Sequence, residues 1–206
     1  MLRSLIVALL AVVSLSGASW DVSRVMPSLA RLTVEGREGN CTAFAIHEKK
    51  GHWVTMSHCL PDTPTDVRLN GDAKLLEVLY RADGDTPAAV FVADKGAHAL
   101  KLGDEPKRGD DILQIGFGAG SGTPFFYEGL LVSPSVQVTT VHETEVSLQF
   151  NSAHGMPGMS GGPLINRKYR VVGVISGGMQ PTPVPSMLSF SPRYVDLKAL
   201  IDKFGG

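Results

Sequence analysis

The stretch Gly158-Met159-Ser160-Gly161-Gly162-Pro163-Leu164-Ile165 carries the most information about the fold. A serine between glycines leaves the neighbouring backbone amides open, because glycine has no Cβ atom to obstruct a group that approaches them. Amides placed in this way stabilise the charge that develops on a carbonyl oxygen under attack. Pro163-Leu164-Ile165 is a short apolar run that begins with proline, which predicts a strand after the serine.

Two other fold classes carry a nucleophilic serine in a similar setting. The motif also fits the Gly-x-Ser-x-Gly elbow of α/β-hydrolases, in which the histidine base follows the serine along the chain. Here every histidine precedes Ser160, which excludes that class; the histidines are at positions 47, 52, 58, 98, 142 and 154. A subtilisin-type arrangement needs a helix that begins at the serine, and the predicted strand excludes it. The order of catalytic residues along the chain that remains is histidine, aspartate, serine.

Short apolar runs recur between Gly, Pro, Asn and Asp residues, which is typical of an all-β protein. The segment 102–109 is rich in Gly, Pro and charged residues and separates two groups of runs. We therefore predict two six-stranded antiparallel β-barrels, one over 19–105 and one over 106–206, with a short C-terminal helix. The glycine-rich segment 116–122 leads into a strand and not a helix, so we interpret it as a flexible turn and not a phosphate loop. The predicted strands are 30–34, 42–47, 52–55, 67–69, 74–80, 88–92, 111–115, 127–133, 136–141, 145–150, 163–165 and 171–176.

Residues 1–18 read as a signal peptide with Arg3 at its start, an apolar core and small residues before a predicted cleavage after Ala18. The apolar core is shorter than the roughly 20 residues that cross a bilayer, so we expect no stable membrane insertion after cleavage. The sequence predicts a secreted or periplasmic protein; an uncleaved anchor is the alternative.

The composition is that of an ordinary globular protein, with 206 residues, 43% of them hydrophobic and 19% charged, and a formal net charge of −1. No basic run is present, which argues against nucleic acid as a partner. Nothing in the sequence implies a catalytic metal or another cofactor.

The two cysteines, Cys41 and Cys59, predict one disulfide in an oxidising compartment. Such a bridge would close a loop of about 18 residues and stabilise the fold by roughly 3 kcal/mol in the chain-entropy model. A zinc site is the alternative, because His47, His52 and His58 lie nearby in the sequence. No Cys-x-x-Cys or His-x-x-x-His spacing supports it.

A second motif, Trp53-Val54-Thr55-Met56-Ser57-His58-Cys59, is an apolar run that ends in a histidine followed by a cysteine. With it, the chain resembles the chymotrypsin-like serine peptidases, over essentially 30–200. The stretches 109–116 and 158–166 look most like compact bacterial members, including the protease domain of the high-temperature-requirement (Htr) group. The resemblance implies that His58 is the general base and Ser160 the nucleophile.

In this family a carboxylate completes a catalytic triad with the histidine and the serine, and here the chain departs from the family pattern. Family members generally have an Asp just before a small apolar strand, where this chain has Pro87. A proline cannot orient an imidazole, so a nearby carboxylate is required. We favour Asp85, with Asp83 or no functional acid as alternatives; the segment also fits a plain turn.

The resemblance also implies an oxyanion hole made by the backbone amides of Gly158 and Ser160. Met159 stands where trypsin-like zymogens have an Asp that receives a new N-terminal ammonium. A thioether cannot accept that charge, so we predict no activation by N-terminal insertion.

Family spacing places the base of the primary specificity pocket at His154, although a solvent-facing loop histidine is an equal interpretation. Ser176, Gly177 and Gly178 would form one wall and the edge on which an extended substrate pairs. The sequence therefore predicts a serine endopeptidase that acts on protein or peptide substrates. A catalytically impaired binding module and an esterase on the same fold are the alternatives.

Overall fold

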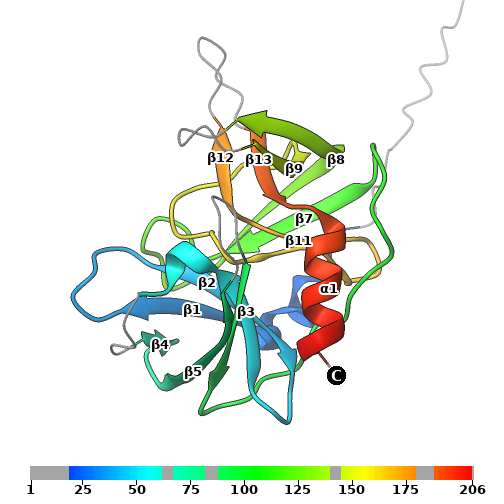
Figure 1. Ribbon diagram of the computed structural model, residues 1–206. Helices are drawn as coiled ribbons and strands as arrows, with labels where there is room; N and C mark the ends of the chain where they lie inside the picture. Colours follow the sequence, from blue (N-terminus) through cyan, green and yellow to red (C-terminus); the bar gives the residue numbers. More distant parts are fainter. Residues whose placement is uncertain (1–18, 62–66, 82–87, 140–144, 180–187, 206) are drawn as a thin grey trace, which may run out of the picture.

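The apolar runs of the first half of the chain form a closed antiparallel barrel in the computed structural model, which describes residues 19–61, 67–81, 88–139, 145–179 and 188–205. The strand order around the barrel is β1-β2-β3-β6-β5-β4 (Figure 1). The first barrel is thus six-stranded, as predicted. Its strands are β1 (Leu29–Val34), β2 (Cys41–His47), β3 (His52–Met56), β4 (Val67–Leu69), β5 (Ala73–Arg81) and β6 (Ala88–Ala93).

Burial explains why β3 and β6 lie at the centre of this barrel. Every residue of β3 is buried, and so is every residue of β6 except Val92. The two strands pair from His52 opposite Val92 to Met56 opposite Ala88. Strands buried on both faces read as continuous apolar runs. The end of β3 is followed at once by a 3₁₀ turn, Ser57–Cys59, which carries His58 to the surface of the barrel.

The second half forms one seven-stranded sheet in the order β11-β10-β7-β8-β9-β13-β12. A second closed six-stranded barrel is therefore not confirmed: the described strands number seven, and no ladder joins β11 to β12. These edge strands are separated by only Ile175 and Ser176 along the chain, so the sheet curls until its two edges are neighbours. The strands are β7 (Asp111–Gly116), β8 (Phe125–Thr139), β9 (Glu145–Asn151), β10 (Pro163–Ile165), β11 (Val171–Val174), β12 (Gly177–Met179) and β13 (Leu188–Pro192).

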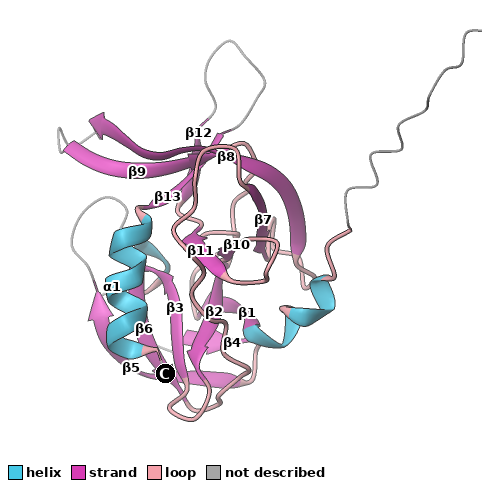
Figure 2. Ribbon diagram, turned by 90° about the vertical axis from the view of Figure 1, so that its right-hand side faces the viewer, coloured by secondary structure: helices cyan, strands magenta, loops and turns pink. Residues whose placement is uncertain are grey.

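Helix α1 (Tyr194–Phe204) spans both halves of the molecule, with its end on the first barrel (Figure 2). The predicted apolar face is buried: Tyr194, Leu197, Leu200 and Ile201. The last three belong to one core cluster with residues of the first barrel and of β7, β10 and β11. His52 fixes the end of the helix, with its Nδ1 2.7 Å from the carbonyl oxygen of Phe204. The helix and both sheets therefore contribute to one core cluster, and a second, smaller cluster lies in the second half.

Two short 3₁₀ turns, Val22–Arg24 and Met26–Ser28, lead into β1. Val25 between them is fully buried. Trp20 packs edge-on against Tyr169, and the guanidinium of Arg167 lies 4.2 Å from the centre of the Trp20 ring. This segment is thus part of the folded structure. The predicted signal peptide, 1–18, lies outside the described residues, among which no helix is long and apolar enough to cross a membrane.

Candidate active site

A disulfide joins Cys41 and Cys59, as the cysteine count predicted. It ties the first residue of β2 to the 3₁₀ turn that follows β3, with 5.9 Å between the two Cα atoms. Donor atoms of Cys41, His58 and Cys59 lie within 4.8 Å of one another. The two sulfurs are bonded to each other, however, and neither is the thiolate that zinc requires. The bridge therefore serves as a structural clamp next to His58.

His58 borders a hollow of about 180 Å³ whose walls include the disulfide, Leu32 and Asn40. The residue as a whole is exposed, but burial of its imidazole lowers the pKa of His58 below the ordinary value of 6.5. Burial disfavours the charged form of a histidine. The imidazole is therefore neutral, and able to accept a proton, over a wider pH range than a free histidine.

Ser160 belongs to the second half of the chain, yet its backbone is held by the first barrel. The amide of Thr42 donates a hydrogen bond to the Ser160 carbonyl oxygen at 2.8 Å. Cys59 Sγ lies 3.7 Å from the same oxygen. The serine hydroxyl donates to the carbonyl oxygen of Ser176 at 3.0 Å. The fold thus brings the serine motif to the turn that carries His58, and Ser176 to the serine hydroxyl.

The turn before Ser160 leaves two backbone amides without an acceptor. The amides of Gly158 and Ser160 make no hydrogen bond to any described residue. The intervening amide, that of Met159, is engaged with the Met156 carbonyl oxygen at 3.1 Å, and the Met159 side chain is fully buried. Gly158 has φ +98°, which residues with a Cβ rarely adopt. Two amides with no acceptor among the described residues, one on each side of the engaged Met159 amide, are donors that could bind an oxyanion.

The glycine-rich segment 116–122 holds this turn in place, a role that the sequence did not suggest. Ala119 donates its amide to the Pro157 carbonyl oxygen at 2.7 Å. Because the two ends of a trans peptide point in opposite directions, this bond turns the Gly158 amide away from the loop. A Cβ at Gly116 would lie 2.8 Å from the Met159 Cα, so the close approach requires glycine there. The segment contains the predicted turn at 119–120 and also contacts the backbone before Ser160.

Asp85, Asp83 and Pro87 lie outside the described residues. The register of β3 and β6 nevertheless fixes where the chain resumes, because Ala88 pairs with Met56, two residues before His58. Asp85 is three residues before Ala88, and three extended residues reach about 10 Å.

The predicted substrate-binding residues lie at one edge of the second sheet and beside it. Ser176 directly precedes β12, which ends the strand order and begins with Gly177 and Gly178. His154 is exposed, with its ring edge-on to that of Tyr127. Its backbone carbonyl accepts a hydrogen bond from the buried side-chain amide of Gln114 at 2.8 Å. The carbonyl, and not the imidazole, is thus the part of His154 that faces a buried polar group.

A family model for the trypsin-like peptidase domain matches residues 41–174, from the first cysteine to the end of β11. The chain belongs to this family. The trypsin-like peptidases are serine endopeptidases, so the resemblance drawn from the serine and histidine motifs is confirmed.

Curated relatives of this trypsin-like peptidase include Protease Do-like 2, chloroplastic, from Arabidopsis thaliana, which is 29% identical over 148 residues, covering 67% of the chain and 24% of the relative. A probable periplasmic serine endoprotease, DegP-like, from Pseudomonas putida is 31% identical over 138 residues, covering 64% of the chain and 28% of the relative. These relatives agree with the predicted Htr group. The chain spans about a quarter of their length.

Solved structures show the same fold as this trypsin-like peptidase. The inactive form of Rv3671c protease superposes with a TM-score of 0.71 and 19% identity, over 90% of this chain and 92% of the other. The active form of Rv3671c protease from M. tuberculosis gives a TM-score of 0.72 with 18% identity, over 90% and 84%.

Proposed function

We propose that this protein is a serine endopeptidase in which Ser160 is the nucleophile, His58 the general base and the amides of Gly158 and Ser160 the oxyanion hole. The observation that carries the proposal is the pair of free amides around the buried Met159, on a serine whose carbonyl is bound by the first barrel. Free donors beside a hydroxyl have no structural purpose in a turn, but they suit a carbonyl oxygen that becomes negatively charged.

The reaction begins when the Ser160 hydroxyl turns from the Ser176 carbonyl, its partner at 3.0 Å, toward His58. His58 takes the hydroxyl proton as the serine oxygen bonds to the substrate carbonyl carbon. The resulting oxyanion accepts hydrogen bonds from the two amides. His58 then gives the proton to the leaving amine, the peptide bond breaks, and an acyl-enzyme remains. Water, deprotonated by His58, releases the acid and restores the serine.

Asp85 is the carboxylate that we assign to orient His58. The support for this assignment is that Asp85 lies only three residues before Ala88, which pairs with Met56 at the end of β3. Asp83 is two residues farther from this anchor, which is why we prefer Asp85.

Substrate would bind as an extended peptide along β12, whose outer edge ends the strand order. Ser176, Gly177 and Gly178 would supply the backbone groups for this pairing, with His154 near the primary pocket. A protein or peptide substrate fits such an edge better than a small ester does. We also propose export after cleavage behind Ala18, to the periplasm or outside the cell, because the disulfide suits an oxidising compartment.

Labelling with a fluorophosphonate tests the proposal. The probe should modify Ser160 in the natural protein, fail with Ser160→Ala and be strongly slowed in His58→Ala, with all three proteins folded by circular dichroism. Casein or a peptide library should be cleaved by the natural protein alone. Labelling without any cleavage would favour the impaired binding module, and labelling that is unaffected by His58→Ala would contradict the assigned base.

A further inference from the structure

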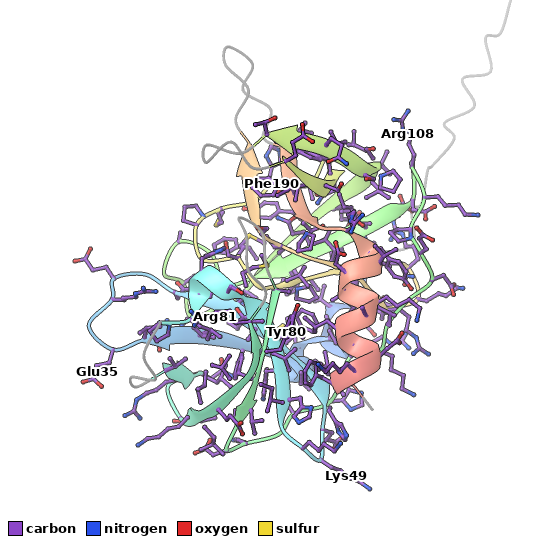
Figure 3. The ribbon with its side chains drawn as sticks, viewed as in Figure 1. Glu35, Lys49, Tyr80, Arg81, Arg108 and Phe190 are labelled. Atoms are coloured by element: carbon purple, nitrogen blue, oxygen red, sulfur yellow. A yellow bond between two sulfur atoms is a disulfide. The ribbon has the colours of Figure 1, made fainter. Side chains whose placement is uncertain are left out.

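Asn40 lies at the junction of the two halves of the molecule. It ends the connection from β1 to β2, which begins with the exposed Glu35 (Figure 3). Asn40 itself is half-buried and lines the hollow that His58 borders. No motif of the sequence drew attention to it.

The side-chain amide of Asn40 reaches two carbonyl groups of the second half. Its Nδ2 donates to the Phe117 carbonyl oxygen at 2.6 Å and lies 3.4 Å from that of Gly158. It is also 3.3 Å from the carbonyl of its neighbour Cys41. Carbonyl oxygens only accept hydrogen bonds, so this end of the side chain must be the NH₂ group. The Oδ1 atom is consequently buried with no partner among the described residues.

Thr42, which lies in β2 two residues after Asn40, contacts the same two backbone segments. Its hydroxyl donates to the Gly158 carbonyl at 3.0 Å and accepts from the Phe117 amide at 2.8 Å. Thr42 is fully buried. The backbone N–H and C=O groups of Phe117, and the carbonyl of Gly158, are therefore held by side chains of the first half.

We propose that Asn40, with Thr42 as its partner, is a positioning residue for the oxyanion hole, an inference that rests on the proposed function. Glycine permits a wide range of backbone angles, so the Gly158 carbonyl could point in several directions. The direction that it takes affects where the amides of Gly158 and Ser160 point. Thr42 holds that carbonyl at 3.0 Å, and Asn40 contacts it at 3.4 Å while it holds the neighbouring Phe117 carbonyl at 2.6 Å, both from the opposite half of the molecule. An unpaired, buried Oδ1 lowers stability, so the side chain is better explained by what it holds than by its own contribution to folding.

Asn40→Ala and Asn70→Ala form a matched pair for the test. Asn70 also belongs to the first half, and its side chain also bonds to a backbone group, accepting from the Arg31 amide at 2.8 Å. It is exposed, however, and does not line the His58 hollow. Complete loss of one oxyanion donor costs about 10²–10³ in kcat, so loosening one should cost about tenfold. We expect Asn40→Ala to lower kcat by about this factor, with KM nearly constant and the pH midpoint of kcat/KM unchanged.

Thr42→Val and Thr42→Ser form a second pair of variants. They test the same inference if Asn40→Ala does not fold. Valine keeps the shape and loses the hydroxyl, whereas serine keeps the hydroxyl. Thr42→Val should lose kcat and Thr42→Ser should restore most of it, while Asn70→Ala matches the natural protein. Equal kcat for Asn40→Ala and Asn70→Ala, or equal loss in both Thr42 variants, would overturn the inference. A natural protein that no fluorophosphonate labels would instead refute the proposed function itself.

Discussion

The protonation of His58 sets the acid limit of the proposed reaction. Burial lowers the pKa of His58 below 6.5, and only the neutral imidazole can accept the serine proton. Activity is therefore absent below this pKa and rises as the pH increases through it. We expect the acid limb of kcat/KM to have its midpoint below 6.5, measured on a peptide substrate in buffers of constant ionic strength. A midpoint above 6.5 would mean that a negative charge, such as the Asp85 carboxylate that we propose beside the imidazole, outweighs burial at His58.

Replacement of Gly158 by alanine should remove most activity. The new Cβ would lie 2.5 Å from the Phe117 carbonyl oxygen, and φ +98° is unfavourable for alanine. The turn must shift and the two amides with it, so we expect kcat to fall by about 10² or more. Steady-state kinetics on the folded variant would measure this.

Gly71→Ala is the matched control for that change. Gly71 has a similar φ, +83°, but a Cβ there would meet nothing within 4 Å. Both variants should lose about 1 kcal/mol of stability from the backbone conformation, and only Gly158→Ala should lose turnover. If the two variants had similar kinetics, the position of the Gly158 and Ser160 amides would not contribute to catalysis.

Local motifs were enough to propose Ser160 and His58 from the sequence alone, because the glycines and the cysteine that mark them are their immediate neighbours. Asn40 could not be found in this way. Its contacts with Phe117 and Gly158 span 77 and 118 residues, and nothing near Asn40 in the sequence signals them.

At the scale of the elements, the disulfide is the feature with the clearest energetic consequence. The bridge closes a loop of 18 residues between β2 and the turn of His58, which should contribute about 3 kcal/mol to the free energy of unfolding. We expect the double variant Cys41→Ala/Cys59→Ala to lose about this amount in urea denaturation.

A reducing agent provides the control for the disulfide. It should bring the natural protein down to the stability of the double variant and leave the double variant unchanged. A natural protein whose urea midpoint is insensitive to reduction would show that the bridge contributes little.

Strands were predictable where apolar runs are continuous, and β4 and β10 begin and end where expected. Strand β13 was missed because its buried positions include Ser189 and Ser191, which read as loop residues. Strand β8 was expected as two strands because Pro134 interrupts the pattern, but register shifts between Leu131 and Val136 absorb the proline within one strand. The expected strand 171–176 ends at Val174, and the chain resumes as β12 on the opposite edge of the sheet.

At the scale of the whole molecule, α1 joins the two halves through a common core. Leu197 is 1% exposed and belongs to the cluster that includes residues of both sheets. Leu197→Ala should lower the free energy of unfolding by about 2–5 kcal/mol, as expected for a leucine removed from a packed interior. Thermal unfolding followed by circular dichroism and by intrinsic fluorescence should shift together, since one core unfolds as a unit.

Val195→Ala, on the exposed side of the same helix, is the comparison. Val195 is 49% exposed, so its loss should change stability by less than about 0.5 kcal/mol. Equal effects of the two substitutions, or two separate transitions in Leu197→Ala, would argue that the halves unfold independently.

Both cysteines belong to the first barrel, and the nucleophile belongs to the sheet that follows it. In a chain that crosses a membrane from its N-terminus, oxidation can therefore seal the first half while the segment with Ser160 is still being translocated. In a chain exported in this way, the disulfide can form before Ser160 reaches the same compartment, so the proposed site would be assembled only after the cysteines have been oxidised.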